Sequence, residues 1–155
     1  MCRKQKFANI AYKNALDSSM NFKHGAIITK GSKVIVTGNN KENRTKILGQ
    51  IHTCIHAEID VANKLMNILR NKKNKNLNKY ILWVVRAPND KILQGKNIYR
   101  NSKPCKLCVQ KLRKLGFSKI GYSDDVGNII VQFIDDIQDQ IMSHAQSSLF
   151  KYLKK

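Results

Sequence analysis

The fold of this chain can be read outward from two stretches of its sequence, Cys54-Ile55-His56-Ala57-Glu58 and Pro104-Cys105-Lys106-Leu107-Cys108. An apolar stripe at helical spacing runs through or follows each stretch and predicts helices over 56–70 and 105–115. Proline is tolerated at the start of a helix, and Gly116 is the residue type expected just beyond a helix C-terminus. We therefore expect both stretches to lie at helix N-termini.

Strands and helices alternate through the rest of the chain. Apolar spacing predicts an amphipathic helix over 5–20, and two β-rich runs around a glycine-containing turn predict a hairpin. The expected strands are 24–30, 33–38, 80–86, 118–123 and 129–134. A last helix is expected over 135–153. This order of elements predicts an α/β domain of two or three layers.

The last two expected strands are joined by a short turn at 124–128. A parallel return needs a connection of about a dozen residues or more. We therefore expect strands four and five of the sheet to be antiparallel.

Length and composition favour one globular domain over residues 1–155, with 42% hydrophobic and 25% charged residues. The longest apolar runs, such as 81–85, are far too short to span a bilayer. The N-terminus is basic but lacks an apolar stretch behind it, which is not typical of a secretory signal. We expect a cytoplasmic protein with no membrane partner.

The chain is strongly basic, with 29 Lys and Arg against 10 Asp and Glu and a net charge of +19. Such a surface attracts polyanions, either nucleic acid or phosphorylated small molecules. An A/T-rich genome would also enrich lysine, isoleucine and asparagine without any selection for binding. Charge alone therefore leaves contact with nucleic acid open.

Cys105 and Cys108 form a C-x-x-C pair, which indicates metal or redox chemistry in a chain with no export signal. At positions i and i+3 of a helix, both thiols would project from one face. His56 would supply a third ligand, and one His with two Cys leaves the fourth position of a tetrahedral zinc ion open for catalysis. Taken singly, the pair could instead be a redox site or half of a structural zinc site.

Together these residues match the pattern H-x-E…P-C-x-x-C, which fixes residue types, order and position in the helices. The chain resembles the zinc-dependent cytidine and deoxycytidylate deaminase superfamily, which also contains tRNA adenosine deaminases and polynucleotide cytidine deaminases. The resemblance covers nearly the whole chain, through the segments 24–28, 38–40, 54–58 and 101–108. It implies a three-layer α/β/α, cytidine deaminase-like fold with a five-stranded mixed sheet.

The resemblance also implies roles for the site residues. Zinc would be held by His56, Cys105 and Cys108 and would make a water nucleophilic near neutral pH. Glu58 would take a proton from that water, pass it to the ring nitrogen and protonate the leaving ammonia.

Three substrate contacts are implied in the same way. Asn40 would contact the sugar, and the backbone N–H of Ala57 would bind the pyrimidine O2. Backbone carbonyls near Ser102 would accept a hydrogen bond from the exocyclic amine.

We rank three functions. The first is hydrolysis of cytosine to uracil in cytidine, deoxycytidine or their monophosphates. The antiparallel last strands resemble those of nucleoside cytidine deaminases, whereas one His with two Cys resembles the deoxycytidylate and nucleic-acid branches. Several arginines and a lysine flank the site motifs and could hold phosphate, although solvated charge is the default for each: Arg44, Arg86, Arg100 and Lys103.

The second function is a nucleic-acid deaminase acting on single-stranded DNA, RNA or tRNA. Its basic surface would follow the backbone, and Trp83, Tyr99 or Phe117 would be available for base stacking. Trp83 lies within an apolar strand, however, and is expected in the core. The third function is a binding module without catalysis, which the intact Glu58 disfavours. Family members are often dimers or tetramers, so a homo-oligomer is left open.

Overall fold

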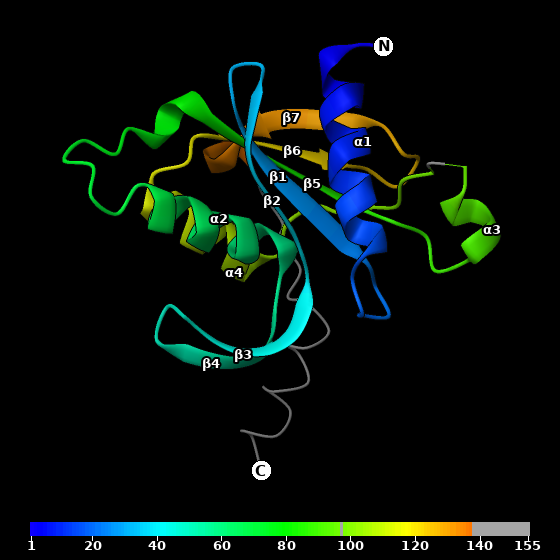
Figure 1. Ribbon diagram of the computed structural model, residues 1–155, viewed down its shortest axis with the longest axis horizontal. Helices are drawn as coiled ribbons and strands as arrows, with labels where there is room; N and C mark the ends of the chain where they lie inside the picture. Colours follow the sequence, from blue (N-terminus) through cyan, green and yellow to red (C-terminus); the bar gives the residue numbers. More distant parts are fainter. Residues whose placement is uncertain (97, 138–155) are drawn as a thin grey trace.

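A mixed five-stranded sheet forms the middle layer of the protein in the computed structural model, which describes residues 1–96 and 98–137 (Figure 1). The strands follow the order β2-β1-β5-β6-β7. Their bounds are β1 His24–Lys30, β2 Lys33–Asn39, β5 Tyr80–Arg86, β6 Lys119–Ser123 and β7 Ile129–Phe133. β5 and β6 run parallel, and the other neighbouring pairs run antiparallel.

The expected antiparallel pairing of the last two strands is confirmed for β6 and β7. Lys119 lies opposite Phe133, and Ser123 lies opposite Ile129. These are the fourth and fifth strands in the order of the sheet. Counted along the chain they come later, because a hairpin that the sequence does not predict precedes them.

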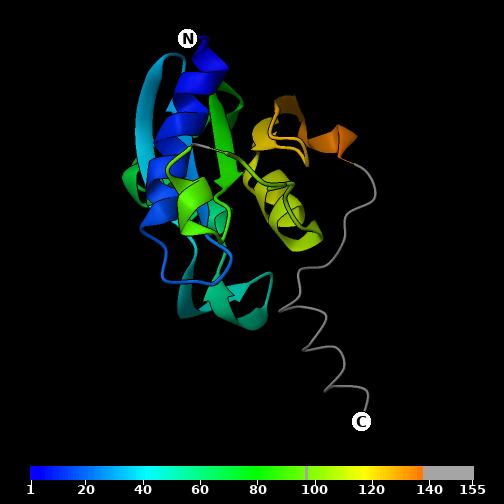
Figure 2. The same cartoon turned by 90° about the vertical axis from the view of Figure 1, so that its right-hand side faces the viewer.

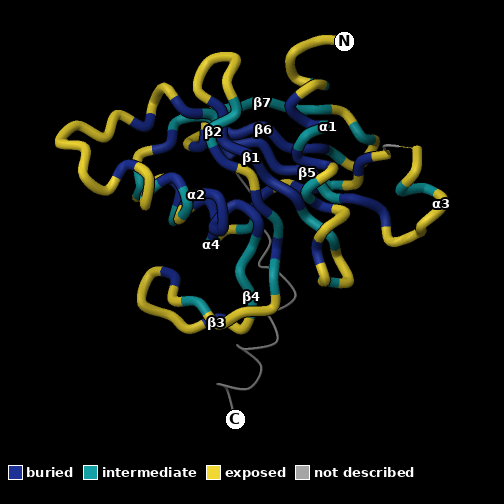
Figure 3. Tube along the Cα trace, viewed as in Figure 1, coloured by how far each residue is buried: buried dark blue, intermediate teal, exposed yellow. Residues whose placement is uncertain are grey.

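This unpredicted hairpin consists of β3 (Lys41–Ile47) and β4 (Gln50–Ile55), which form a separate two-stranded sheet. It extends away from the main sheet, and its turn is exposed (Figures 1 and 3). Leu48 and Gly49 form the turn with φ of 49° and 85°, so both residues are left-handed as in a type I′ turn. The usual sequence for a type I′ turn is Asn-Gly or Asp-Gly. Leucine occupies the first position here, so the turn cannot be recognised from the sequence.

Helices cover both faces of the main sheet, as a three-layer α/β/α fold requires (Figures 1 and 2). α1 (Arg3–Leu16) packs on one face, and α2 (Ala57–Ile68) and α4 (Lys106–Leu115) pack on the other. Three shorter elements complete the description: η1 Leu77–Lys79, α3 Lys91–Gln94 and η2 Ile134–Asp136. The helix predicted over 135–153 lies, beyond residue 137, outside the described residues.

The core is divided by the sheet into two apolar layers. One layer lies between the sheet and α2 with α4, and includes Leu82 and Ile120. The other lies under α1 and includes Trp83, which is 4% exposed. The Trp83 ring packs against Phe7 with centroids 5.2 Å apart, and its Nε1 donates to Thr29 Oγ1 at 2.9 Å. Trp83 is therefore a core residue, as expected.

No helix within 1–96 and 98–137 is both long enough and apolar enough to cross a membrane.

The contact between α1 and β1 depends on Gly25. A Cβ atom at this position would lie 2.0 Å from the backbone oxygen of Ala11 and 2.4 Å from the backbone nitrogen of Ala15. Both atoms belong to the backbone of α1, so they cannot move without moving the helix. Gly25 therefore sets how closely α1 approaches the sheet.

Replacing Gly25 by alanine should lower the free energy of unfolding by about 3 kcal/mol or more, because α1 must move off the core. Urea denaturation of the wild type and the variant measures this difference. Gly95→Ala is the matched control: Gly95 has an ordinary φ of −67°, and the nearest atom to its Cβ would be 3.7 Å away. Equal denaturation midpoints for Gly25→Ala and Gly95→Ala would contradict the close packing of α1.

Candidate active site and metal centre

His56 and Cys105 occupy equivalent positions at the starts of two helices. His56 is the N-cap of α2 and Cys105 is the N-cap of α4, and both have extended backbone. The expected helix starts are thus shifted by one residue. α2 and α4 are in contact on one face of the sheet (Figure 1). Their N-caps bring the side chains of His56 and Cys105 together.

The imidazole of His56 and the sulfur atoms of Cys105 and Cys108 form one cluster, with their ligand atoms all within 4.8 Å of one another. His56 Nδ1 lies 3.5 Å from Cys105 Sγ and 3.3 Å from Cys108 Sγ. In a tetrahedral site with Zn–S of about 2.3 Å and Zn–N of about 2.0 Å, nitrogen and sulfur ligands are separated by about 3.5 Å. The observed separations fit zinc, and three protein ligands leave one position for water or substrate.

The electrostatics of this cluster follow from its hydrogen bonds and its burial. Hydrogen bonding from Cys108, and secondarily from His56, lowers the pKa of Cys105 to about 4 despite burial. Burial opposes the charged form of His56, but hydrogen bonds to Cys105 and Cys54 and nearby negative charge raise its pKa to about 11. Metal ligation needs thiolates and a neutral imidazole, so zinc binding releases protons and depends on pH.

Glu58 lies in the first turn of α2 and is only 5% exposed. Burial raises the pKa of its carboxyl group to about 7, against the opposing charge of His56. A carboxyl group that titrates near neutral pH can both accept and return a proton, which suits general acid–base chemistry. The role of Glu58 as a proton shuttle stays a prediction, now for a buried carboxyl group two residues after His56.

Two of the three predicted substrate contacts lie close to this cluster in the sequence, Ala57 directly after His56 and Ser102 three residues before Cys105. Ala57 is the first residue of α2, where backbone N–H groups have no acceptor within the helix. Ser102 is buried; its Oγ bonds to the carbonyl oxygen of Val84 at 2.8 Å, and its N–H donates to the carbonyl of Ser123 at 2.8 Å. Any contact of Ser102 with a base would therefore use its backbone carbonyl.

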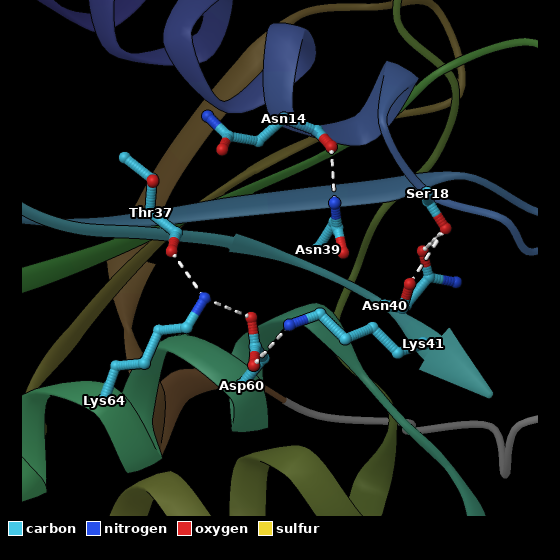
Figure 4. Close-up of polar contacts among 8 residues, drawn as sticks. All are labelled: Asn14, Ser18, Thr37, Asn39, Asn40, Lys41, Asp60 and Lys64. Atoms are coloured by element: carbon cyan, nitrogen blue, oxygen red, sulfur yellow. Dashed lines mark hydrogen bonds and ion pairs between the residues drawn. The ribbon is translucent and has the colours of Figure 1, made fainter. Parts of the chain in front are cut away.

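Asn40 is held firmly between β2 and the segment after α1 (Figure 4). Its Oδ1 accepts hydrogen bonds from Ser18 Oγ at 2.7 Å and from the His24 N–H at 2.9 Å, and its Nδ2 donates to the Phe22 carbonyl at 2.7 Å. An amide group offers two acceptor sites and two N–H donors. One Nδ2–H is thus left for a ligand, while the other contacts fix the orientation of the amide.

Sequence reasoning missed an ionic cluster that fixes α2 against β2 (Figure 4). The carboxylate of Asp60 pairs with Lys41 Nζ at 3.3 Å and with Lys64 Nζ at 2.8 Å, and Lys64 also donates to the Thr37 carbonyl at 2.9 Å. A Cβ atom at Gly38 would lie 2.1 Å from Asp60 Oδ2. Asp60 belongs to no motif, and its burial in the first turn of α2 is apparent only in the folded chain.

Two histidines near the centre were also missed. Burial, and to a lesser extent the charges of Arg86 and His56, lower the pKa of His24 to about 4. His52 on β4 is 8% exposed, and its Nε2 has no hydrogen-bond partner in the described part of the chain. Neither residue belongs to the H-x-E or C-x-x-C patterns, so only the folded chain reveals them.

Comparison with known proteins gives one family and two similar structures. The family model described as the cytidine and deoxycytidylate deaminase zinc-binding region matches residues 1–124. No curated protein sequence matches the chain. The dCMP deaminase of the cyanophage S-TIM5 is similar in its apo form, with 18% identity, 79% of this chain and 82% of that chain covered and a TM-score of 0.49. The structure of its complex with dCMP and dUMP is similar at 17% identity, with 79% of this chain and 81% of that chain covered and a TM-score of 0.50.

We predict one tightly bound zinc ion per chain, held by His56, Cys105 and Cys108. Elemental analysis of protein purified without added metal should give a stoichiometry near one. Replacing both Cys105 and Cys108 by serine should abolish zinc binding, because a hydroxyl is a far poorer zinc ligand than a thiolate. Cys2→Ser, at an exposed position, is the control and should keep its zinc. Zinc retained by the double variant would show that the metal lies elsewhere.

Proposed function

The chain belongs to the zinc-binding family of cytidine and deoxycytidylate deaminases, and from this membership we propose that it converts cytosine to uracil in a free pyrimidine nucleoside or nucleotide. Zinc is the cofactor of this family region. The observation that carries the proposal is the cluster of His56, Cys105 and Cys108, whose ligand atoms lie within 4.8 Å of one another, together with the buried carboxyl group of Glu58 two residues after His56. A structural zinc site needs no such proton-transfer group.

In the proposed mechanism His56, Cys105 and Cys108 hold the metal. A zinc ion held by these three residues would lower the pKa of a water molecule to about 7 and so would supply a nucleophile near neutral pH. Glu58 would take one proton from the water and deliver it to ring nitrogen N3 of the base while the water oxygen adds to C4. It would then move the second proton from the new C4 hydroxyl group to the amino group, so that the C–N bond breaks and ammonia leaves. The near-neutral pKa of Glu58 lets it perform both directions of transfer.

The surrounding backbone orients the base. The N–H of Ala57 donates to the pyrimidine O2, and the carbonyl region at Ser102 accepts from the exocyclic amine. The remaining Nδ2–H of Asn40 donates to a sugar hydroxyl, while Ser18, Phe22 and His24 keep the amide in place. These contacts would distinguish cytosine from uracil mainly through the amine.

A nucleic-acid deaminase is the second candidate, and the net charge of +19 favours it. The three aromatic residues that the sequence suggests for base stacking are, however, in the interior: Trp83 is 4%, Tyr99 5% and Phe117 4% exposed, whereas Phe22 and Phe133 are about half exposed. Base stacking on aromatic side chains supplies much of the affinity for single strands. We therefore rank the free nucleoside or nucleotide first.

A panel of substrates tests the proposed function directly. Zinc-loaded protein is incubated with cytidine, CMP, dCMP, adenosine, single-stranded DNA and tRNA, and ammonia release is measured. We expect release from a free cytosine nucleoside or nucleotide. Ammonia release from adenosine alone would show that the base is not cytosine. Release from tRNA alone would show that the substrate is not a free nucleoside or nucleotide.

Replacing Glu58 by glutamine should lower the deamination rate by about 10⁴-fold or more, because general acid–base assistance is worth about 10²–10⁴-fold and Glu58 serves several proton transfers. Zinc content should stay unchanged. Glu42→Gln makes the same chemical change at an exposed position of β3 and is the control. A Glu58→Gln variant that keeps a tenth or so of the activity, or that loses zinc, would show that Glu58 is not the proton shuttle.

Salt dependence tests the second candidate. If the basic surface binds nucleic acid, affinity for single strands should fall by orders of magnitude between roughly 50 and 200 mM salt for six or more phosphate contacts. Fluorescence anisotropy with a labelled oligonucleotide measures the slope. Absence of binding at low salt, or a flat slope, would leave codon composition as the better account of the charge.

A further inference from the structure

The β3–β4 hairpin begins and ends at residues of the candidate site (Figure 1). Asn40 directly precedes β3, and His56 directly follows β4. Lys41 lies opposite Ile55 in the register of the hairpin, so Asn40 and His56 adjoin one and the same strand pair. The Cα atoms of directly opposite residues in two antiparallel strands are about 5 Å apart. The base of the hairpin is therefore next to the metal centre.

The hairpin is held against the helices at both of its ends. At its base, Lys41 Nζ contacts Asp60 Oδ1 in the first turn of α2 at 3.3 Å (Figure 4). At its tip, Ile47 is 2% exposed and belongs to one apolar cluster with Ile59 of α2 and Cys108 of α4. One face of the hairpin therefore lies against the first turns of α2 and α4.

The register of the hairpin shows that His52 lies on this inner face. Side chains alternate between the two faces along a strand, and residues directly opposite each other share a face. By this rule His52 shares the face of Ile47. Cys54 follows two residues later on the same face, and its side chain is hydrogen-bonded to His56. The residue before His52, Ile51, points to the opposite face and is 69% exposed, whereas His52 is 8% exposed.

The imidazole of His52 has an unmet hydrogen bond. Its Nε2 is buried and has no hydrogen-bond partner within residues 1–96 and 98–137. Buried polar side-chain atoms are nearly always hydrogen-bonded, so this nitrogen needs a partner that the described chain does not supply. Burial and the charge of His56 lower the pKa of His52, so the ring is neutral near pH 7. A neutral imidazole offers one N–H donor and one acceptor nitrogen.

The course of β4 indicates which part of a substrate lies near His52. The reacting base belongs at the metal and at the helix starts, whereas β4 leads away from them. His52 is four residues before His56, which corresponds to about 13 Å along a strand. Asn40, the residue expected to contact the sugar, lies at the base of the same hairpin. The inner face of the hairpin is therefore the side of the site where the sugar is expected.

We propose that His52 is a further substrate-binding residue, whose Nε2 forms a hydrogen bond with a hydroxyl group of the substrate's sugar. This rests on the proposed function and adds a residue to its substrate site. A hydroxyl group both donates and accepts, so it suits a neutral imidazole in either tautomer. The sugar does not react, so the contact stabilises ground state and transition state alike and acts on KM more than on kcat.

The test removes the hydrogen bond from the protein and from the substrate in turn. His52→Leu removes the imidazole, and 2′-, 3′- and 5′-deoxycytidine each lack one sugar hydroxyl. His52→Leu should raise KM for cytidine about 2–10-fold, the range of one neutral hydrogen bond, and should leave kcat near its wild-type value. For the one analogue that lacks the contacted hydroxyl, the wild type and His52→Leu should have the same KM. His52→Gln keeps a nitrogen donor and should recover part of the loss.

Thr53→Val is the matched control. Thr53 is the next residue of β4 and is exposed on the opposite face, and the substitution likewise removes a hydrogen-bonding group. This variant should keep the wild-type KM for every substrate. The zinc content of His52→Leu should match that of the wild type, because His52 is not among the three clustered ligands. Loss of zinc in His52→Leu would show that His52 acts on the metal centre and not on the sugar.

Three kinetic outcomes would overturn the proposal: an unchanged KM in His52→Leu, an equal rise in KM for cytidine and all three analogues, or a fall in kcat alone. Calorimetric binding of uridine to the zinc-loaded protein separates this proposal from the proposed function, because it requires no deamination. If no substrate releases ammonia but His52→Leu weakens uridine binding, the deaminase function fails and the sugar contact stands. If uridine binds equally to the wild type and His52→Leu, or to neither, the sugar contact fails.

Discussion

Helices α2 and α4 have to begin at one point, because the imidazole of His56 and the thiols of Cys105 and Cys108 can share a metal ion only within bonding distance. Each N-cap residue is preceded by chain that positions it: β4 comes before His56, and the segment after Arg100 comes before Cys105. The apolar layer under both helices fixes their positions on the sheet. The positive ends of the two helix dipoles meet here, which would be unfavourable without the negative charge of thiolate ligands.

The elements around the site follow from local patterns in the sequence. An apolar stripe after His56 and another after Cys105 are enough to predict α2 and α4, since helix starts depend on adjacent residues. The short turn before Ile129 predicts an antiparallel last strand in the same local way. The meeting of the two helix starts in space depends on the pairing of β1, β5 and β6, which no local pattern encodes. For that step the resemblance to a family was needed, and the folded chain now brings the three ligand residues together.

Other features could not be predicted, and each has a physical reason. The β3–β4 hairpin turns at Leu48, a residue that seldom adopts a positive φ, so the usual turn sequence is absent. The Asp60 cluster joins residues from β2, β3 and α2, and its members look like ordinary solvated charges when read singly. The same applies to Arg86 and Arg100, whose juxtaposition results from a bridge between distant segments.

The bridge between Arg86 and Arg100 also makes the length of the loop between them independent of the position of Cys105 and Cys108. The chain leaves the sheet at Arg86 and comes back to the same place at Arg100, so the excursion between them is closed at its base. Lengthening such a loop twofold costs only about 0.6 kcal/mol in closure entropy. Insertions or deletions there would change the loop, while Ser102, anchored to β5 and β6, keeps the following Cys105 and Cys108 in place. The length of this loop can thus change without moving Cys105 and Cys108 away from His56.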